Sequence, residues 1–529
     1  MSAAKEENGY RPQEGHDSSQ NGGNEADNQV LSNQKLFMVT CSISISYFLV
    51  LLNSTVVVTT IPSLTSSFNS TQDVGWYGSA YLLSSCATQP LSGKVYTFYS
   101  LKYVFLCFMG VFELGSLLCG VATSSPMFII GRAVAGLGAA GITSGAMTIV
   151  ATTAPRPKRP YITGFAMAVG SMGQVTGPLV GGVLTQYVSW RWSFYINLPL
   201  GGATALLILF IKIPDQRDKT RGKRLMEALH ELDLVGFAIV CPAVVMFLLA
   251  LNWGGNTYPW RSATIIGLFC GAVLATCIFI GWEWHKGREA MIPLYMLRHR
   301  LIASCLWTGF LQSGAIVEMT YFLPIWFQAV RGDSATMSGV NLMATVGSQI
   351  FFAAMTGLLV SKVGYPLPFA LFGSSCLAIG AGLMSTLTPS ANVGPWVGYQ
   401  ILTGAGRGIV QQLPIGVVQA ALTGEEIAVG TSILAFVQYL GAAIFISGAN
   451  SLFSNKLITA LQIMVPEIDA AEVLKSGAAE LIKVVPAAYE PQILLAYSKA
   501  VTSTFYLAAA AGAATLFTSM GFGLINIKK

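Results

Sequence analysis

Residues 127–150 read MFIIGRAVAGLGAAGITSGAMTIV and carry a single charged side chain, Arg132. At about 1.5 Å of rise per residue, a helix of this length crosses the roughly 30 Å hydrocarbon core of a bilayer. In the whole chain 53% of residues are apolar and only 10% are charged, whereas soluble domains carry roughly 25% charged residues. We therefore predict that this stretch is a transmembrane helix and that most of the chain lies in a membrane.

Similar apolar runs recur on both sides of this stretch and predict an all-α polytopic membrane protein. An even number of spans places both termini on one side. The fourteen predicted spans lie near residues 37–61, 74–92, 103–122, 127–150, 161–186, 191–212, 233–252, 262–284, 301–328, 337–361, 367–387, 394–422, 429–453 and 501–525.

The basic residues predict which side of the membrane holds the termini. Lys and Arg concentrate in the loops that follow even-numbered spans, whereas the short opposite loops carry only Arg191, Arg261 and Arg331. Because cytosolic loops are enriched in Lys and Arg, we expect both termini in the cytosol. The sequon Asn69-Ser70-Thr71 then falls in the first outside loop, where Asn69 is a predicted glycosylation site.

Three segments between or before the spans are polar. Residues 1–36 lack the apolar core of a signal peptide, which predicts a disordered cytosolic tail. Residues 213–232 are mixed in charge and predict a cytosolic linker along the membrane surface. Residues 454–500 contain three prolines and predict a long outside loop with short helices.

Several functions are disfavoured by what the sequence contains. The basic residues form no face for nucleic acid, and the nine cysteines lie in apolar segments without CxxC spacing, so we expect no metal site. The GxGxxG match at 136–141 continues an apolar helix with no strand before it, which favours helix packing over dinucleotide binding. A GxxxxGK[ST] motif is absent from the sequence, and no cluster suggests catalysis. We expect neither an enzyme nor a cofactor.

Four charged residues lie inside predicted spans: Glu113, Arg132, Glu318 and Arg407. A charge near the middle of a bilayer costs about 3 kcal/mol or more, so such residues are rare unless they have a function. One interpretation is a proton or substrate relay that faces a wet cavity. The alternative is a fixed ion pair or bonds to backbone carbonyls.

The predicted fifth span contains four glycines around one proline: Gly173, Gly177, Pro178, Gly181 and Gly182. Proline removes a backbone donor and bends a helix, while glycine allows another helix to approach closely. The pattern favours a pliable helix that acts as a gate, with a simple close helix contact as the alternative.

Aromatic and amide side chains within the spans suggest a cargo cavity. Neutral amides inside a bundle can bind oxygen-rich molecules, although interhelical hydrogen bonds and interfacial aromatics explain the same residues. The candidates are Gln89, Gln174, Tyr321, Trp326, Phe327, Gln328, Gln411, Gln412 and Gln438.

Together these motifs resemble the major facilitator superfamily, specifically its fungal fourteen-span drug:H+ antiporter branch. Asn53 lies in a stretch similar to the first-helix motif of that branch, which usually has Asp there. Five segments carry the resemblance: Leu52–Val57, Gly93–Lys102 (motif A, with Gly93 and Lys102), Gly131–Gly138 (motif B), Gly173–Gly182 (motif C, the antiporter signature) and Tyr321–Gln328.

The resemblance implies a major facilitator fold with two six-helix domains, 37–212 and 285–529, and two inserted helices in 233–284. It also implies alternating access about a midplane site. Our candidates for proton coupling or gating are Asn53, Glu113, Arg132, Glu318 and Arg407. We predict a monomeric plasma-membrane exporter of a hydrophobic or amphipathic small molecule, driven by a proton gradient. A vacuolar or vesicular membrane, an uptake or vacuolar permease for a nutrient or siderophore, and a non-transporting sensor are the alternatives.

Overall fold

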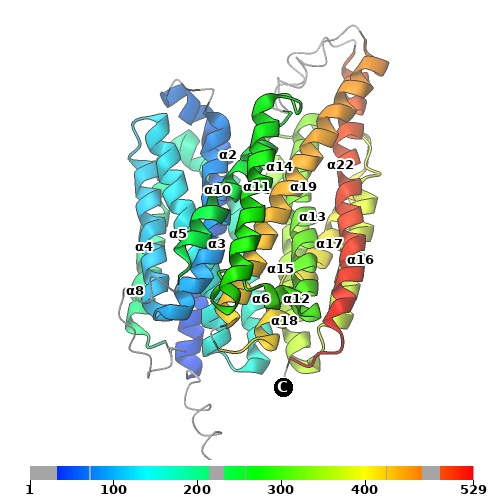
Figure 1. Cartoon of the computed structure of the whole chain (residues 1–529). Coiled ribbons are helices and arrows are strands. Elements are labelled where there is room, and N and C mark those ends of the chain that lie inside the picture. The colour runs from blue at the N-terminus through cyan, green and yellow to red at the C-terminus, as the bar shows by residue number, and fades with distance from the viewer. Residues whose placement is uncertain are drawn as a thin grey trace, which may run out of the picture.

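The computed structural model describes residues 32–68, 70, 73–213, 232–255, 258–424, 426–466 and 489–527. These residues are almost entirely helical and contain no β-strand (Figure 1). Eleven of the described helices are long and apolar enough to cross a membrane. The all-α membrane fold predicted from hydropathy is confirmed.

Each predicted span corresponds to one helix or to one helix pair. The first half contains α2 (Asn33–Phe68), α3 (Val74–Phe98), α4 (Leu101–Gly120), α5 (Ser125–Thr153), α6 (Arg159–Tyr187) and the pair α7 (Trp192–Tyr195) and α8 (Asn197–Phe210). Next come α10 (Leu234–Trp253) and α11 (Ala263–Lys286). The second half contains α13 (Arg300–Arg331), the pair α14 (Ala335–Asn341) and α15 (Met343–Val363), α16 (Leu367–Met384), the pair α17 (Val393–Val410) and α18 (Leu413–Ala421), α19 (Glu426–Met464) and α22 (Glu490–Ser519).

The helices form two bundles that meet along a few helices. Helices α2–α8 pack mainly on one another, as do α13–α22. The bundles touch where α6 packs on α15 and where α3 and α5 pack on α19 (Figure 1). Helix α10 packs on α3, and α11 packs on α10. Helices α3, α6 and α17 are more polar and are not among the eleven helices that are long and apolar enough to cross a membrane. Because α3 and α6 pack on the opposite bundle, much of their surface is shielded from lipid.

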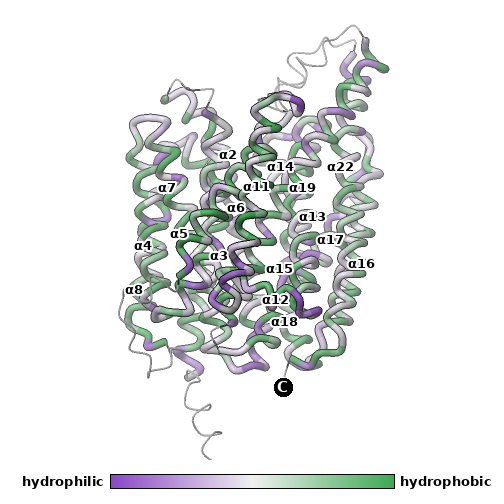
Figure 2. Tube along the Cα trace, in the orientation of Figure 1, coloured by the Kyte–Doolittle hydropathy of each residue, from purple (hydrophilic) through white to green (hydrophobic). Residues whose placement is uncertain are grey.

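Both described ends of the chain lie at one end of the bundle. Lys158 Nζ, after α5, donates to Asn33 Oδ1 at 3.2 Å, next to the start of α2. The Ile527 backbone N–H donates to Gly364 O at 2.9 Å. We call this the terminal end; it is the lower end in Figure 1. Hydrophilic segments gather toward the helix ends, for example around α12 (Leu294–Arg298) and α18 (Figure 2).

The helix boundaries differ most from the predicted spans in the second half of the chain. The last two helices reach into the segment 454–500 that we predicted as a loop, because α19 continues to Met464 and α22 begins at Glu490. The span predicted over 394–422 breaks at Gln411–Gln412, since Pro414 in the first turn of α18 cannot donate a backbone hydrogen bond.

Some predictions lie outside the described residues. These are the tail up to residue 31, most of the linker (214–231), the middle of the predicted outside loop (467–488) and the sequon residue Asn69.

Candidate functional site

Arg132 of α5 is completely buried and is held by two other helices of the first half. Its Nε donates to Tyr77 O at 2.8 Å, and its Nη1 donates to Asn53 O at 2.9 Å and Asn53 Oδ1 at 3.0 Å. The guanidinium carbon lies 4.5 Å from the centre of the Tyr81 ring. Among the described residues no carboxylate pairs with this cation; Arg132 Nη2 and Asn53 Nδ2 have no partner.

The structure separates Glu113 from this network. Glu113 is half-buried on α4 and faces α8, where a Cβ at Gly201 would lie 1.7 Å from its Oε1. Neither of its carboxylate oxygens has a hydrogen-bond partner. Its contacts within the α4–α8 pair do not bring it to Arg132.

Glu318 and Arg407 lie in the second half, on α13 and α17. Glu318 is fully buried, makes no ion pair among the described residues, and faces the Thr504 hydroxyl of α22. Arg407 is 6% exposed, and its Nη2 donates to Thr320 Oγ1 at 2.7 Å. The two charges make no ion pair with each other.

The glycines of α6 form a close seam with α2. A Cβ at Gly173 would lie 2.3 Å from Phe48 O, one at Gly177 would lie 2.1 Å from Thr55 Oγ1, and one at Gly181 would lie 2.7 Å from Val56 O. Gly182 has nothing within 4 Å, and α6 continues as one helix through Pro178. Three of the four glycines therefore lie in a close contact with α2.

A cavity lies between the two halves at the α6–α15 contact. It holds about 430 Å³ of empty space, part of it open to solvent. Helices α6, α13, α15 and α17 and the residue before α15 line it with polar and apolar side chains: Ser171, Gln174, Val175, Met319, Thr320, Leu323, Leu342, Thr345, Val346, Gln349, Thr403 and Arg407.

Two of the predicted site residues line this cavity, Gln174 and Arg407. The sequence analysis missed Gln349, whose Nε2 bridges Ser171 Oγ at 2.8 Å in the first half and Gln411 Oε1 at 2.9 Å in the second. Gln349 could have been predicted in the same way as the other candidate glutamines, because it is an amide inside an apolar span.

The other predicted cavity residues lie elsewhere. Gln89 bonds Ser144 within the first half, and the Gln438 carbonyl accepts a bond from Ser313 between α13 and α19. Trp326 and Phe327 belong to the core of the second half, where Trp326 Nε1 donates to Ser498 and Phe327 packs on Trp396. Tyr321 is exposed and Gln328 is half-buried, and neither lines this cavity.

At the terminal end, hydrogen bonds connect the two halves. Gln419 Nε2 of α18 donates to Met147 O of α5 at 3.0 Å, and Lys94 Nζ of α3 donates to Glu289 O at 3.1 Å. Gly93, which we predicted in a loop motif, lies within α3, where a Cβ would lie 2.0 Å from Ser432 Oγ of α19. Lys102 instead stays within the first half and donates to Leu209 O.

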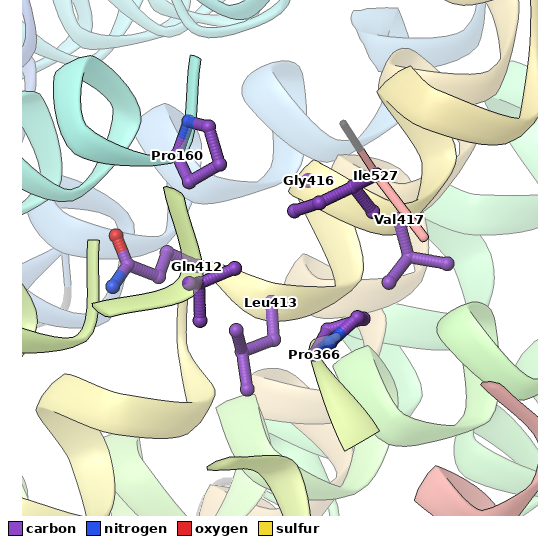
Figure 3. A pocket seen from close by; sticks show the side chains of 8 residues that line it. Pro160, Pro366, Gln412, Leu413, Gly416, Val417 and Ile527 are labelled. Carbon is purple, nitrogen blue, oxygen red and sulfur yellow. The ribbon is translucent and has the colours of Figure 1, made fainter. Parts of the chain in front are cut away.

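A second, smaller cavity lies beneath this closure (Figure 3). Its walls are mainly apolar and include Pro160 of α6, Leu413 and Val417 of α18, and Ile527 near the C-terminus. Gln412, also predicted as a cavity residue, lines it and donates to Ala353 O at 2.9 Å. The two halves are therefore in contact at this end of the bundle, beside this small cavity.

Comparison with known proteins agrees with this architecture. The chain is 47% identical over 496 residues to the MFS-type transporter pigP of Monascus ruber, covering 93% of this chain and 87% of that protein. It is 45% identical over 502 residues to the efflux pump mokI of Monascus pilosus, covering 93% and 92%.

A solved structure shares the fold. The proton:xylose symporter XylE matches with a TM-score of 0.62 and 14% identity, covering 94% of this chain and 99% of that chain. The profile of the Major Facilitator Superfamily matches residues 43–446. The family predicted from the motifs is confirmed, and this transporter chain belongs to the Major Facilitator Superfamily.

Proposed function

We propose that this chain exports a hydrophobic or amphipathic small molecule in exchange for protons. The observation that carries the proposal is the cavity between the halves, lined by amides, hydroxyls and apolar side chains from both. Such a site at the interface of two bundles suits transport by alternating access. Relatives similar over more than nine-tenths of this chain include a protein named an efflux pump.

We further propose that the terminal end faces the cytosol and that the protein functions as a monomer in the plasma membrane. Lys and Arg concentrate in the loops that follow even-numbered predicted spans, and cytosolic loops are enriched in these residues. We also propose that the two six-helix domains span residues 37–212 and 285–529, with the two inserted helices in 233–284.

For proton coupling the favoured group is Glu318. The Asn53 amide cannot take up a proton near neutral pH, and Glu113 packs in the α4–α8 pair away from the cavity. Glu318 lies on α13, which also supplies Met319 and Thr320 to the cavity wall. A buried carboxyl without a counter-charge is a group that can carry a proton through a transport cycle.

The experiment is efflux of a panel of hydrophobic compounds from cells that carry this protein, with and without a protonophore. We expect outward, protonophore-sensitive transport. Efflux that ignores the protonophore would contradict proton coupling and leave facilitated export. Inward accumulation would favour the uptake alternative instead.

Glu318→Gln is expected to remove the protonophore-sensitive part of efflux. One proton moving down 100 mV releases about 2.3 kcal/mol, which supports a concentration ratio of about fortyfold. We therefore expect the steady-state ratio of cargo to fall by at least about tenfold in this variant. Glu113→Gln is the matched control and should keep the wild-type ratio; loss in Glu113→Gln alone would reassign the proton site.

A further inference from the structure

The cavity between the halves contains one cation and no acid. Of its lining residues only Arg407 is charged; the others are amides, hydroxyls and apolar side chains. Arg407 is 6% exposed, so its guanidinium is almost fully removed from bulk solvent. The charge of this cavity wall is therefore positive.

Within the described part of the chain, no acidic group neutralises Arg407. Its Nη2 bonds the neutral Thr320 hydroxyl, whose own proton goes to Ile316 O at 2.7 Å. Its Nε has no partner. Among the described residues no carboxylate lies within ion-pair distance, and the nearby acid on α13, Glu318, faces Thr504 of α22.

A buried guanidinium without a counter-charge favours the binding of an anion. Burying a charge costs several kcal/mol unless it is paired, and Arg binds carboxylates through a planar fork of donors. Charge-assisted hydrogen bonds of this kind are about twice as strong as neutral ones. A ligand that brings a carboxylate would supply the missing counter-charge.

The rest of the cavity suits the body of such a ligand. Across from Arg407, the half-buried amide of Gln174 on α6 makes no hydrogen bond within the described residues. Met319, Leu323 and Val346 provide apolar wall between these polar groups. A molecule with one carboxylate and an apolar framework matches both parts.

We propose that the cargo is an amphipathic organic anion whose carboxylate pairs with Arg407 in this cavity. The inference rests on the proposed function and narrows its substrate class. Arg407 then acts in cargo binding rather than in proton coupling or gating, the role predicted from its charge inside a span. The two halves share the cargo, since Arg407 and Gln174 belong to different bundles.

The test compares two probes of nearly equal size, 1-pyrenebutyrate and the uncharged 1-pyrenebutanol. Their binding to the full chain in lipid nanodiscs is measured by fluorescence anisotropy at pH 7.4. We expect the wild type to bind the anion about tenfold more tightly than the alcohol, or better. Equal affinities, a preference for the alcohol, or no binding of either probe would overturn the proposal.

Variants locate the preference. Arg407→Gln should bring the two affinities together by weakening the anion alone, and Arg407→Lys should keep part of the preference. Arg261→Gln, which removes an exposed cation between α10 and α11, should behave as the wild type. If Arg407→Gln weakens both probes equally, Arg407 is a structural residue and the proposal fails.

The same probes separate this inference from the proposed direction of transport. Efflux of neutral compounds without any anion preference would overturn the anionic cargo and leave export intact. Anion selectivity together with inward accumulation would support Arg407 as the cargo contact and overturn export.

Discussion

Gly173→Leu is expected to abolish transport and to lower the free energy of unfolding by about 3 kcal/mol. A Cβ at this position would lie 2.3 Å from Phe48 O, and backbone cannot move aside as a flexible side chain can. Overpacking a tight contact typically costs about 1–3 kcal/mol, and here it forces α2 and α6 apart. The measurements are cellular efflux and thermal unfolding of the detergent-solubilised protein.

Gly182→Leu is the matched control on the same helix. Nothing lies within 4 Å of a Cβ at Gly182, so we expect wild-type efflux and a stability within about 0.5 kcal/mol of wild type. A different pattern would revive the gate hypothesis: if Gly182→Leu stops efflux while both variants stay folded, the motif works through the pliability of α6.

The spans were predictable because hydropathy reports the surroundings of a whole helix. The apolar side chains of residues 127–150 must be surrounded by lipid or by other protein side chains. Helix α5, Ser125–Thr153, contains all of these residues. The end of α17 was also predictable from the sequence, since Pro414 lies within the predicted span 394–422. The extension of α19 to Met464 was not predictable from hydropathy, because a helix can continue beyond the hydrocarbon core with polar residues.

The site was harder to predict because residue type does not reveal which way a side chain faces. Trp326 and Arg407 both looked like cavity residues, yet Trp326 packs inside the second half while Arg407 reaches the cavity. Glu113 and Glu318 have the same chemistry and the same expected cost in a membrane. Only the packing of α4 on α8 and of α13 on α22 distinguishes them.

Asn53→Asp is expected to stabilise the protein by about 2 kcal/mol. In the structure Asn53 Oδ1 already accepts from Arg132 Nη1 at 3.0 Å, whereas Asn53 Nδ2 and Arg132 Nη2 are both donors without acceptors. An aspartate has the same shape and replaces the unpartnered Nδ2 donor with an oxygen, which we expect to accept from Arg132 Nη2. The single bond then becomes a two-bond fork between full charges, and thermal unfolding should shift upward.

The sign of this effect should reverse when Arg132 is absent. In an Arg132→Leu background the new carboxylate would be fully buried without a counter-charge, a state that costs about 3–5 kcal/mol. Asn53→Asp should therefore stabilise the parent and destabilise the Arg132→Leu variant, whereas Asn53→Ala should lose stability in the parent alone. A similar increase in stability in both backgrounds would show that the aspartate pairs with a group other than Arg132.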